Sequence, residues 1–138
     1  IRDSLYDIGP RLYCYDIAAR EIVADLEISV GDMWLDDDLI YIVGNEWSNV
    51  TMKNTVSYAV VDVRSHKKVA DSFITDGTET RISKPYGVAV DPVSKDIYVT
   101  DGRNYVNPGD IYCFAPDGTL RWTTPTGDIP AHIAFLRK

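Results

Sequence analysis

The most informative segment of the chain is Lys84-Pro-Tyr-Gly-Val-Ala-Val-Asp-Pro-Val-Ser-Lys-Asp-Ile-Tyr-Val-Thr-Asp101. Two short apolar runs, 86–90 and 97–100, flank the block Asp91-Pro-Val-Ser-Lys-Asp96, which is rich in turn-forming residues. Such a block between two apolar runs predicts a tight reversal between antiparallel strands. We therefore expect a β-hairpin here.

Similar strand pairs recur along the rest of the chain. Residues 21–28 alternate between apolar and mostly polar side chains, as in a strand with one wet face. Residues 39–43 are apolar on both faces, as in a strand covered on two sides, and a polar loop is expected at 45–55. The expected strands are 11–17, 21–28, 30–35, 39–43, 56–63, 69–74, 86–90, 97–101, 110–114 and 119–123. This pattern predicts an all-β protein.

The hairpin also carries a family resemblance. Pro85-Tyr-Gly-Val-Ala-Val-Asp91 followed by Asp96-Ile-Tyr-Val-Thr-Asp101 resembles the first half of a repeat of the NHL and YVTN type. Such repeats occur in β-propellers related to YncE-like and surface-layer proteins, so the resemblance implies consecutive four-stranded antiparallel blades. Pro130 follows Pro85 by 45 residues, within the roughly 40–50 residues of a propeller repeat.

This spacing divides the 138 residues into blades. We expect the outer half of a blade at 1–28, full blades at 29–78 and 79–127, and the first strand of a further blade at 128–138. A propeller closes with roughly 4–8 blades, and closure protects the sheet edges. The chain is thus expected to be a piece of a longer propeller, completed by the remaining blades or by self-association.

The composition argues against two classes of interaction, with nucleic acid and across a membrane. The net charge is −7 and the Lys and Arg residues are scattered, which argues against nucleic acid because phosphate binding needs a clustered basic patch. No apolar run is long enough for a membrane span. The resemblance to surface-layer proteins implies a secreted, periplasmic or cell-surface location.

The two cysteines, Cys14 and Cys113, fall at equivalent places one full blade apart. A disulfide requires Cα atoms within about 7 Å, so we expect two free, buried thiols that act as small hydrophobic side chains.

The sequence lacks a phosphate-binding glycine loop, a His-Glu-x-x-His pair, a Cys-x-x-Cys pair and a Gly-x-Ser-x-Gly elbow. His66 is expected in a solvated turn, and His132 on an innermost strand. Turn positions explain Asp91, Asp96 and Asp117, since Asp hydrogen-bonds its own backbone there. The lack of a complete catalytic constellation favours a non-catalytic protein.

In a propeller, the loops after the second strands and the starts of the innermost strands share one face, where function is expected. Aromatic, amide and charged side chains there suit recognition of a protein, peptide or glycan partner. The candidate ligand-binding residues are Glu46, Trp47, Lys84, Tyr86, Asn104 and Tyr105. No cofactor is expected under this interpretation.

The resemblance leaves one alternative open. Related six-bladed propellers include metal-dependent lactone hydrolases and lyases, whose metal lies in the central channel. Under that hypothesis Glu46, Asp101 and His132 form part of a calcium or zinc site, and the other ligands lie in blades outside this chain.

Overall fold

The computed structural model describes residues 11–48, 52–103, 106–127, 130 and 132–136. Within these residues the protein consists of β-strands and a single-turn 3-10 helix, η1 (Thr78–Arg81). The strands are β1 (Arg11–Asp16), β2 (Glu21–Ser29), β3 (Asp32–Asp36), β4 (Leu39–Ser48), β5 (Lys53–Ser57), β6 (Val60–Asp62), β7 (Lys67–Ala70), β8 (Pro85–Val90), β9 (Ile97–Asp101), β10 (Asp110–Phe114) and β11 (Leu120–Pro125). The all-β prediction is therefore confirmed.

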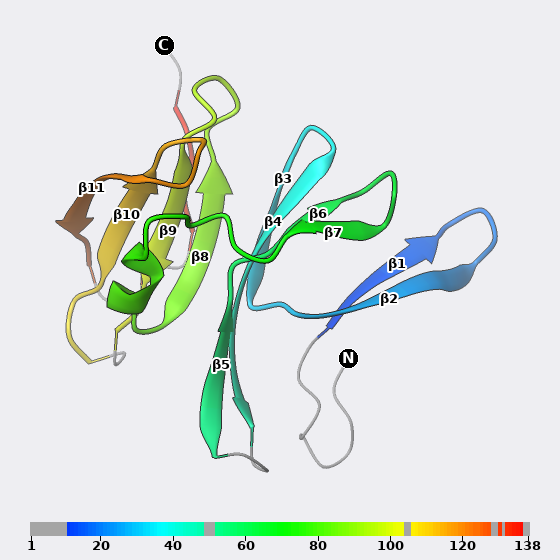
Figure 1. Ribbon diagram of the computed structural model, residues 1–138, viewed down its shortest axis with the longest axis horizontal. Coiled ribbons are helices and arrows are strands. Elements are labelled where there is room, and N and C mark those ends of the chain that lie inside the picture. The colour runs from blue at the N-terminus through cyan, green and yellow to red at the C-terminus, as the bar shows by residue number, and fades with distance from the viewer. Residues whose placement is uncertain (1–10, 49–51, 104–105, 128–129, 131, 137–138) are drawn as a thin grey trace.

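The strands form three antiparallel sheets that lie side by side in chain order (Figure 1). The first sheet is the pair β1–β2, the second has the order β3-β4-β6-β7 with β5 added to β4, and the third has the order β8-β9-β10-β11. The second sheet packs through β4 against β2 and through β3 and β4 against β8. The middle sheet is thus covered on both sides.

One type of turn closes a hairpin in each sheet. An aspartate opens the turn and its carboxylate accepts two backbone N–H groups, while the fourth residue after it adopts a left-handed conformation. The pairs are Asp16 with Arg20, Asp62 with His66, and Asp91 with Lys95. The turn role expected for Asp91 is confirmed, and that of Asp117 also, because its carboxylate accepts the Thr119 N–H at 3.0 Å.

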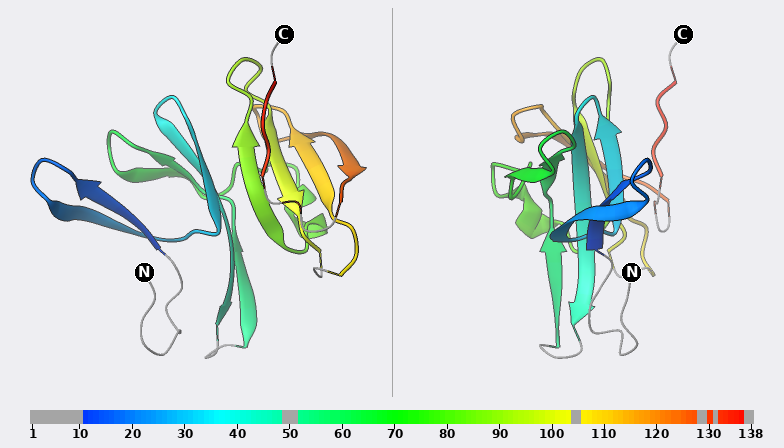
Figure 2. Two further views of the ribbon diagram at one scale, coloured as in Figure 1. Left: turned by 180° about the vertical axis from the view of Figure 1, so that it is seen from behind. Right: turned by 90° about the vertical axis from the view of Figure 1, so that its right-hand side faces the viewer.

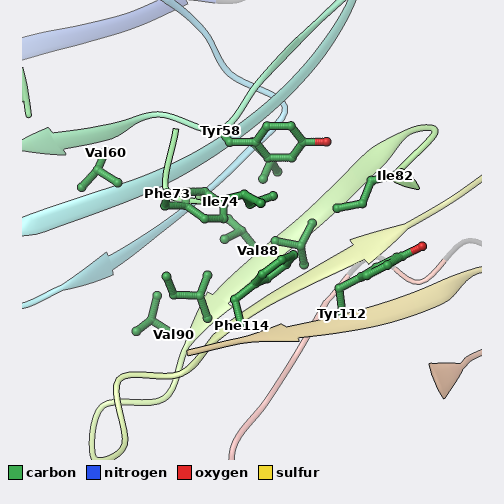
Figure 3. Packing of buried hydrophobic residues seen from close by; sticks show 12 residues of the cluster. Tyr58, Val60, Phe73, Ile74, Ile82, Val88, Val90, Tyr112 and Phe114 are labelled. Atoms are coloured by element: carbon green, nitrogen blue, oxygen red, sulfur yellow. The ribbon is translucent and has the colours of Figure 1, made fainter. Parts of the chain in front are cut away.

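Two hydrophobic clusters fill the spaces between the three sheets. The larger lies between the second and third sheets and contains Val43, Val60, Phe73 and Phe114 (Figure 3). The smaller lies between the first and second sheets and contains Ile42 and Val61 with their neighbours. Neighbouring residues of β4 and β6 thus face opposite clusters, which confirms the expectation that 39–43 is covered on two sides.

The second sheet differs from the expectation in three places. A polar loop was expected at 45–55, but residues 45–48 extend β4 and pair with β5, and this strand pair projects from the sheet (Figure 1). The strand expected at 56–63 is interrupted, because Tyr58 turns into the core between β5 and β6. The strand expected at 69–74 lies at 67–70, and Phe73 and Ile74 leave the sheet to enter the core.

The C-terminal segment runs along the third sheet (Figure 2). The Thr100 hydroxyl donates to the Pro130 carbonyl at 2.6 Å, and the Phe135 ring lies 5.9 Å from that of Trp34 and 5.5 Å from that of Tyr98. Residues 130 and 132–136 have no strand assignment. The first strand of a further blade therefore stays a prediction.

Both cysteines are free thiols, as expected. Cys113 on β10 is fully buried, but Cys14 on β1 is only half-buried, so the expected burial is wrong for Cys14. Cys14 lies in the two-stranded first sheet, which packs against the second sheet on one side, whereas the middle sheet has a sheet on each side. Across the described part of the chain, we find no helix with the length and apolar character of a membrane span.

Candidate functional site

A pocket of about 490 Å³ opens at one end of the third sheet. It lies where η1, the entry to β8, the end of β9 and the start of β10 converge. The residues that line it are Arg81, Ser83, Lys84, Asp101, Arg103, Asn107, Asp110 and Tyr112. A concave site with several convergent polar groups is the usual form of a ligand-binding site.

Asp101 holds the chain segments around this pocket together. The residue is 1% exposed, and its carboxylate accepts three backbone N–H groups, from Ser83 at 3.0 Å, Lys84 at 2.9 Å and Arg103 at 2.8 Å. A buried carboxylate is stable only when it is hydrogen-bonded. The side chain that ends β9 thus ties the entry of β8 to the loop that follows Asp101.

The charges in the pocket are partly paired. Arg103 donates through Nε to Asp110 Oδ2 at 2.7 Å and contacts the same oxygen with its terminal nitrogen. Asp101 is occupied by backbone donors. Arg81 is exposed and has no ion pair within the part of the chain that the structure describes. Its guanidinium is therefore available to a ligand that accepts hydrogen bonds.

Two polar atoms of residues that do not line the pocket are buried without a hydrogen-bond partner among the described residues. They are the hydroxyl of Tyr58, whose side chain belongs to the larger core cluster, and Oε2 of Glu79 on η1. Burial, and then the negative charges of Asp101 and Glu79, raise the pKa of Tyr58. Such unpaired groups are costly in a folded protein and are found at functional sites.

Tyr112 connects these atoms to the pocket. Burial, followed by the charges of Asp101 and Asp110, raises the pKa of Tyr112. Figure 3 shows that the hydroxyl ends of Tyr58 and Tyr112 point to the same side of the core cluster. Charged donors, carboxylate acceptors and the Tyr112 phenol therefore line the pocket at this end of the sheet.

The structure brings together two of the residues proposed from the sequence. Lys84 and Asp101 both line the pocket. Tyr86 is exposed on β8 but does not line the pocket, and His132 is exposed near the C-terminus. Asn104 and Tyr105 lie outside the described residues.

Glu46 and Trp47 lie on the extended part of β4, and their side chains also lie outside what the structure describes. These two positions were expected at the start of a loop. They belong instead to the hairpin with β5, where Glu46 is opposite Thr55 and Trp47 opposite Asn54.

Sequence reasoning missed most of the lining residues. Arg103, Asn107 and Asp110 lie in or directly after the loop already singled out for Asn104, so their position in the repeat could have identified them. Tyr112 follows Asp110 by two residues and shares its face of β10. Arg81 comes from η1, which has no counterpart in the expected repeat.

The alternative metal site is not assembled by the described side chains. Both carboxylate oxygens of Asp101 accept backbone N–H groups. Among the residues that the structure describes, no three His, Cys, Asp or Glu side chains are grouped to hold a metal ion. The side chain of Glu46 is outside this description, so the calcium or zinc site stays a prediction.

Comparison with known proteins identifies no family: no protein-family model matches the chain, and no curated protein sequence matches it.

Proposed function

We propose that this chain is a segment of a β-propeller that serves as a non-catalytic recognition module. Three kinds of observation support the proposal. The sheets follow one another in chain order, the second and third each contain four consecutively linked strands apart from the β5 extension, and the same aspartate turn recurs in all three. The resemblance of residues 85–101 to an NHL or YVTN repeat agrees with this arrangement.

The pocket at Arg81 and Tyr112 carries the proposal, because it offers hydrogen-bond donors and acceptors together. Arg81 and Lys84 are donors, while Asp110 is an acceptor. A peptide backbone or a sugar presents both donors and acceptors, and its apolar faces pack on tyrosine rings. We therefore propose a peptide, a protein loop or a glycan as the ligand.

The proposed setting is a secreted, periplasmic or cell-surface protein. It rests on the likeness of the 85–101 hairpin to surface-layer repeats and on the net charge of −7. In that setting the remaining blades, or further copies of the chain, complete the propeller.

Binding of the 138-residue protein to printed arrays of glycans and of peptides tests this function. We expect a saturable ligand whose affinity falls about 30-fold or more in Arg81→Ala, the loss typical of an arginine at the centre of an interface. The control is Lys68→Ala, which removes an exposed cation from β7, outside the pocket. Affinity that is unchanged in Arg81→Ala, or the absence of any ligand on both arrays, contradicts the proposal.

The same ligand tests the two aromatic residues proposed from the sequence. Trp47→Ala and Tyr105→Ala are expected to weaken binding without unfolding the protein. Retained affinity in both variants confines the site to the lining residues of the pocket.

A further inference from the structure

A second cluster of reactive groups lies between the first and second sheets. Cys14 on β1 and His66 in the β6–β7 turn place Sγ and Nε2 3.4 Å apart. His66 was expected to be solvated, but it is half-buried. The Asp62 carboxylate fixes this turn by accepting the N–H groups of Arg64 and Ser65, which directs the imidazole toward the first sheet.

The pair lines a small apolar pocket of about 90 Å³. Its walls come from both sheets and include Leu12, Leu26, Ile40, Val61 and Val63. A cavity of about 150 Å³ admits benzene, so this smaller space matches a short aliphatic chain better than a ring. The thiol therefore lies beside a binding site for a few methylene groups.

The other cysteine shows what the surroundings of Cys14 add. Cys113 is fully buried, and this burial raises the pKa of its thiol. Buried thiols in apolar surroundings are inert, whereas a thiol beside an imidazole can transfer its proton to the ring and react as a thiolate. Cys14 has the imidazole, partial exposure and an adjacent pocket.

We propose that Cys14 is a site of covalent modification by soft carbon electrophiles with a short aliphatic tail, such as alkyl vinyl ketones, and that His66 acts as its base. The Cys14 proton passes to His66 Nε2, in the tautomer that carries its proton on Nδ1. The sulfur lone pair forms a bond to the terminal vinyl carbon, and the π electrons move to the carbonyl as an enolate. The enolate α-carbon then takes the proton from the imidazolium, so the addition is balanced without a redox partner.

The test measures modification rates of the native 138-residue chain at pH 7, by mass spectrometry of the tryptic peptides that contain each cysteine. The probe is 1-hexen-3-one, and acrylamide serves as a reagent without the tail. The key variant is His66→Asn, because His66 has a φ of 56° and Asn tolerates this left-handed conformation. His132→Asn is the matched control, since His132 is exposed and distant in sequence from Cys14.

We expect Cys14 to react about tenfold more slowly in His66→Asn. An ordinary thiol is only a few per cent thiolate at pH 7, which limits the gain from a base to about 30-fold. Cys113 is expected to remain unmodified. The rate at Cys14 is expected to be the same in His132→Asn as in the native chain. Equal Cys14 rates in the native chain and in His66→Asn overturn the proposal, as does equal reactivity of Cys113.

A measurement on the native chain alone tests the pocket, whatever the folding of the variant. The ratio of the 1-hexen-3-one rate to the acrylamide rate at Cys14 is compared with the same ratio for N-acetylcysteine. We expect the ratio for Cys14 to be several-fold larger. An equal ratio means that the pocket contributes nothing and contradicts the proposed ligand class.

Discussion

Replacing Asp101 should expose how strongly one side chain holds the candidate site together. Asp101→Ala removes the acceptor of three backbone N–H groups, those of Ser83, Lys84 and Arg103. A hydrogen bond to a charged group contributes about 1.5–3 kcal/mol. Because Ser83 and Arg103 are exposed residues, we take the lower end for each of the three bonds and expect a loss of about 4–5 kcal/mol in the free energy of unfolding.

Asp101→Asn removes the negative charge of this side chain but keeps its shape, so it tests the contribution of the charge. Its carbonyl oxygen can keep the contacts that Oδ1 makes with Lys84 and Arg103, but its amide nitrogen faces the Ser83 N–H as a second donor. The loss of one charged bond and the weakening of the other two to neutral bonds amount to about 2–3 kcal/mol. The order of stability is therefore expected to be Asp101, then Asn, then Ala.

Urea unfolding followed by far-ultraviolet circular dichroism measures these differences. Asp71→Ala is the control, because Asp71 is exposed and pairs only with the neighbouring Lys68 in the described structure, so its loss should leave the stability nearly unchanged. The reasoning fails if Asp101→Ala costs less than 1 kcal/mol, or if Asn and Ala are equally destabilising.

Three further outcomes are expected. Gly77 and Gly118 both have positive φ, but a Cβ at Gly77 meets open space while one at Gly118 lies 2.3 Å from the Phe73 carbonyl oxygen; thermal unfolding should therefore show a clearly larger loss for Gly118→Ala than for Gly77→Ala, and equal losses would contradict the packing of this turn. Burial, and next the hydrogen bond to Cys113, raises the pKa of Tyr98 to about 12. The stabilising contribution of the neutral phenol is therefore present below about pH 10 and is lost as the pH rises toward 12. Tyr98→Phe should make stability fall less steeply in this alkaline range, and an unchanged fall would contradict this role of Tyr98. Elemental analysis of the purified protein should find no tightly bound calcium or zinc, whereas one ion per chain would favour the metal-enzyme alternative.

The hairpins could be predicted because their turns are determined locally. In the 84–101 segment, Asp91 accepts the N–H groups of Val93 and Ser94, and Lys95 adopts the left-handed conformation. Each of these features depends on residues that are close in sequence.

The pairing of β4 with β5 could not be predicted in this way. The segment 45–55 is polar and carries no period-2 pattern of apolar residues. Its strands are held by backbone pairing, from Gly44 with Ser57 to Ser48 with Lys53, and that pairing is nearly independent of side-chain polarity. Tyr58 interrupts the strand because its ring packs against that of Phe73, and these two residues are 15 positions apart in the sequence.

The residues of the candidate site also fall into those that could be predicted from the sequence and those that could not. Lys84 and Asp101 could be proposed because they lie at strand ends, where repeat proteins carry function. The roles of Arg81 and Tyr112 depend on η1 and β10 bordering the same pocket, and η1 has no counterpart in the repeat pattern.

The most direct test of the central claim is a map of backbone amide chemical shifts, recorded as the ligand found on the arrays is titrated into the protein. The account predicts that the largest changes fall on residues 81–84, 101–103 and 107–112, which surround the pocket at Arg81 and Tyr112. Changes confined to other parts of the chain, such as the first sheet, would contradict the claim that this pocket is the recognition site.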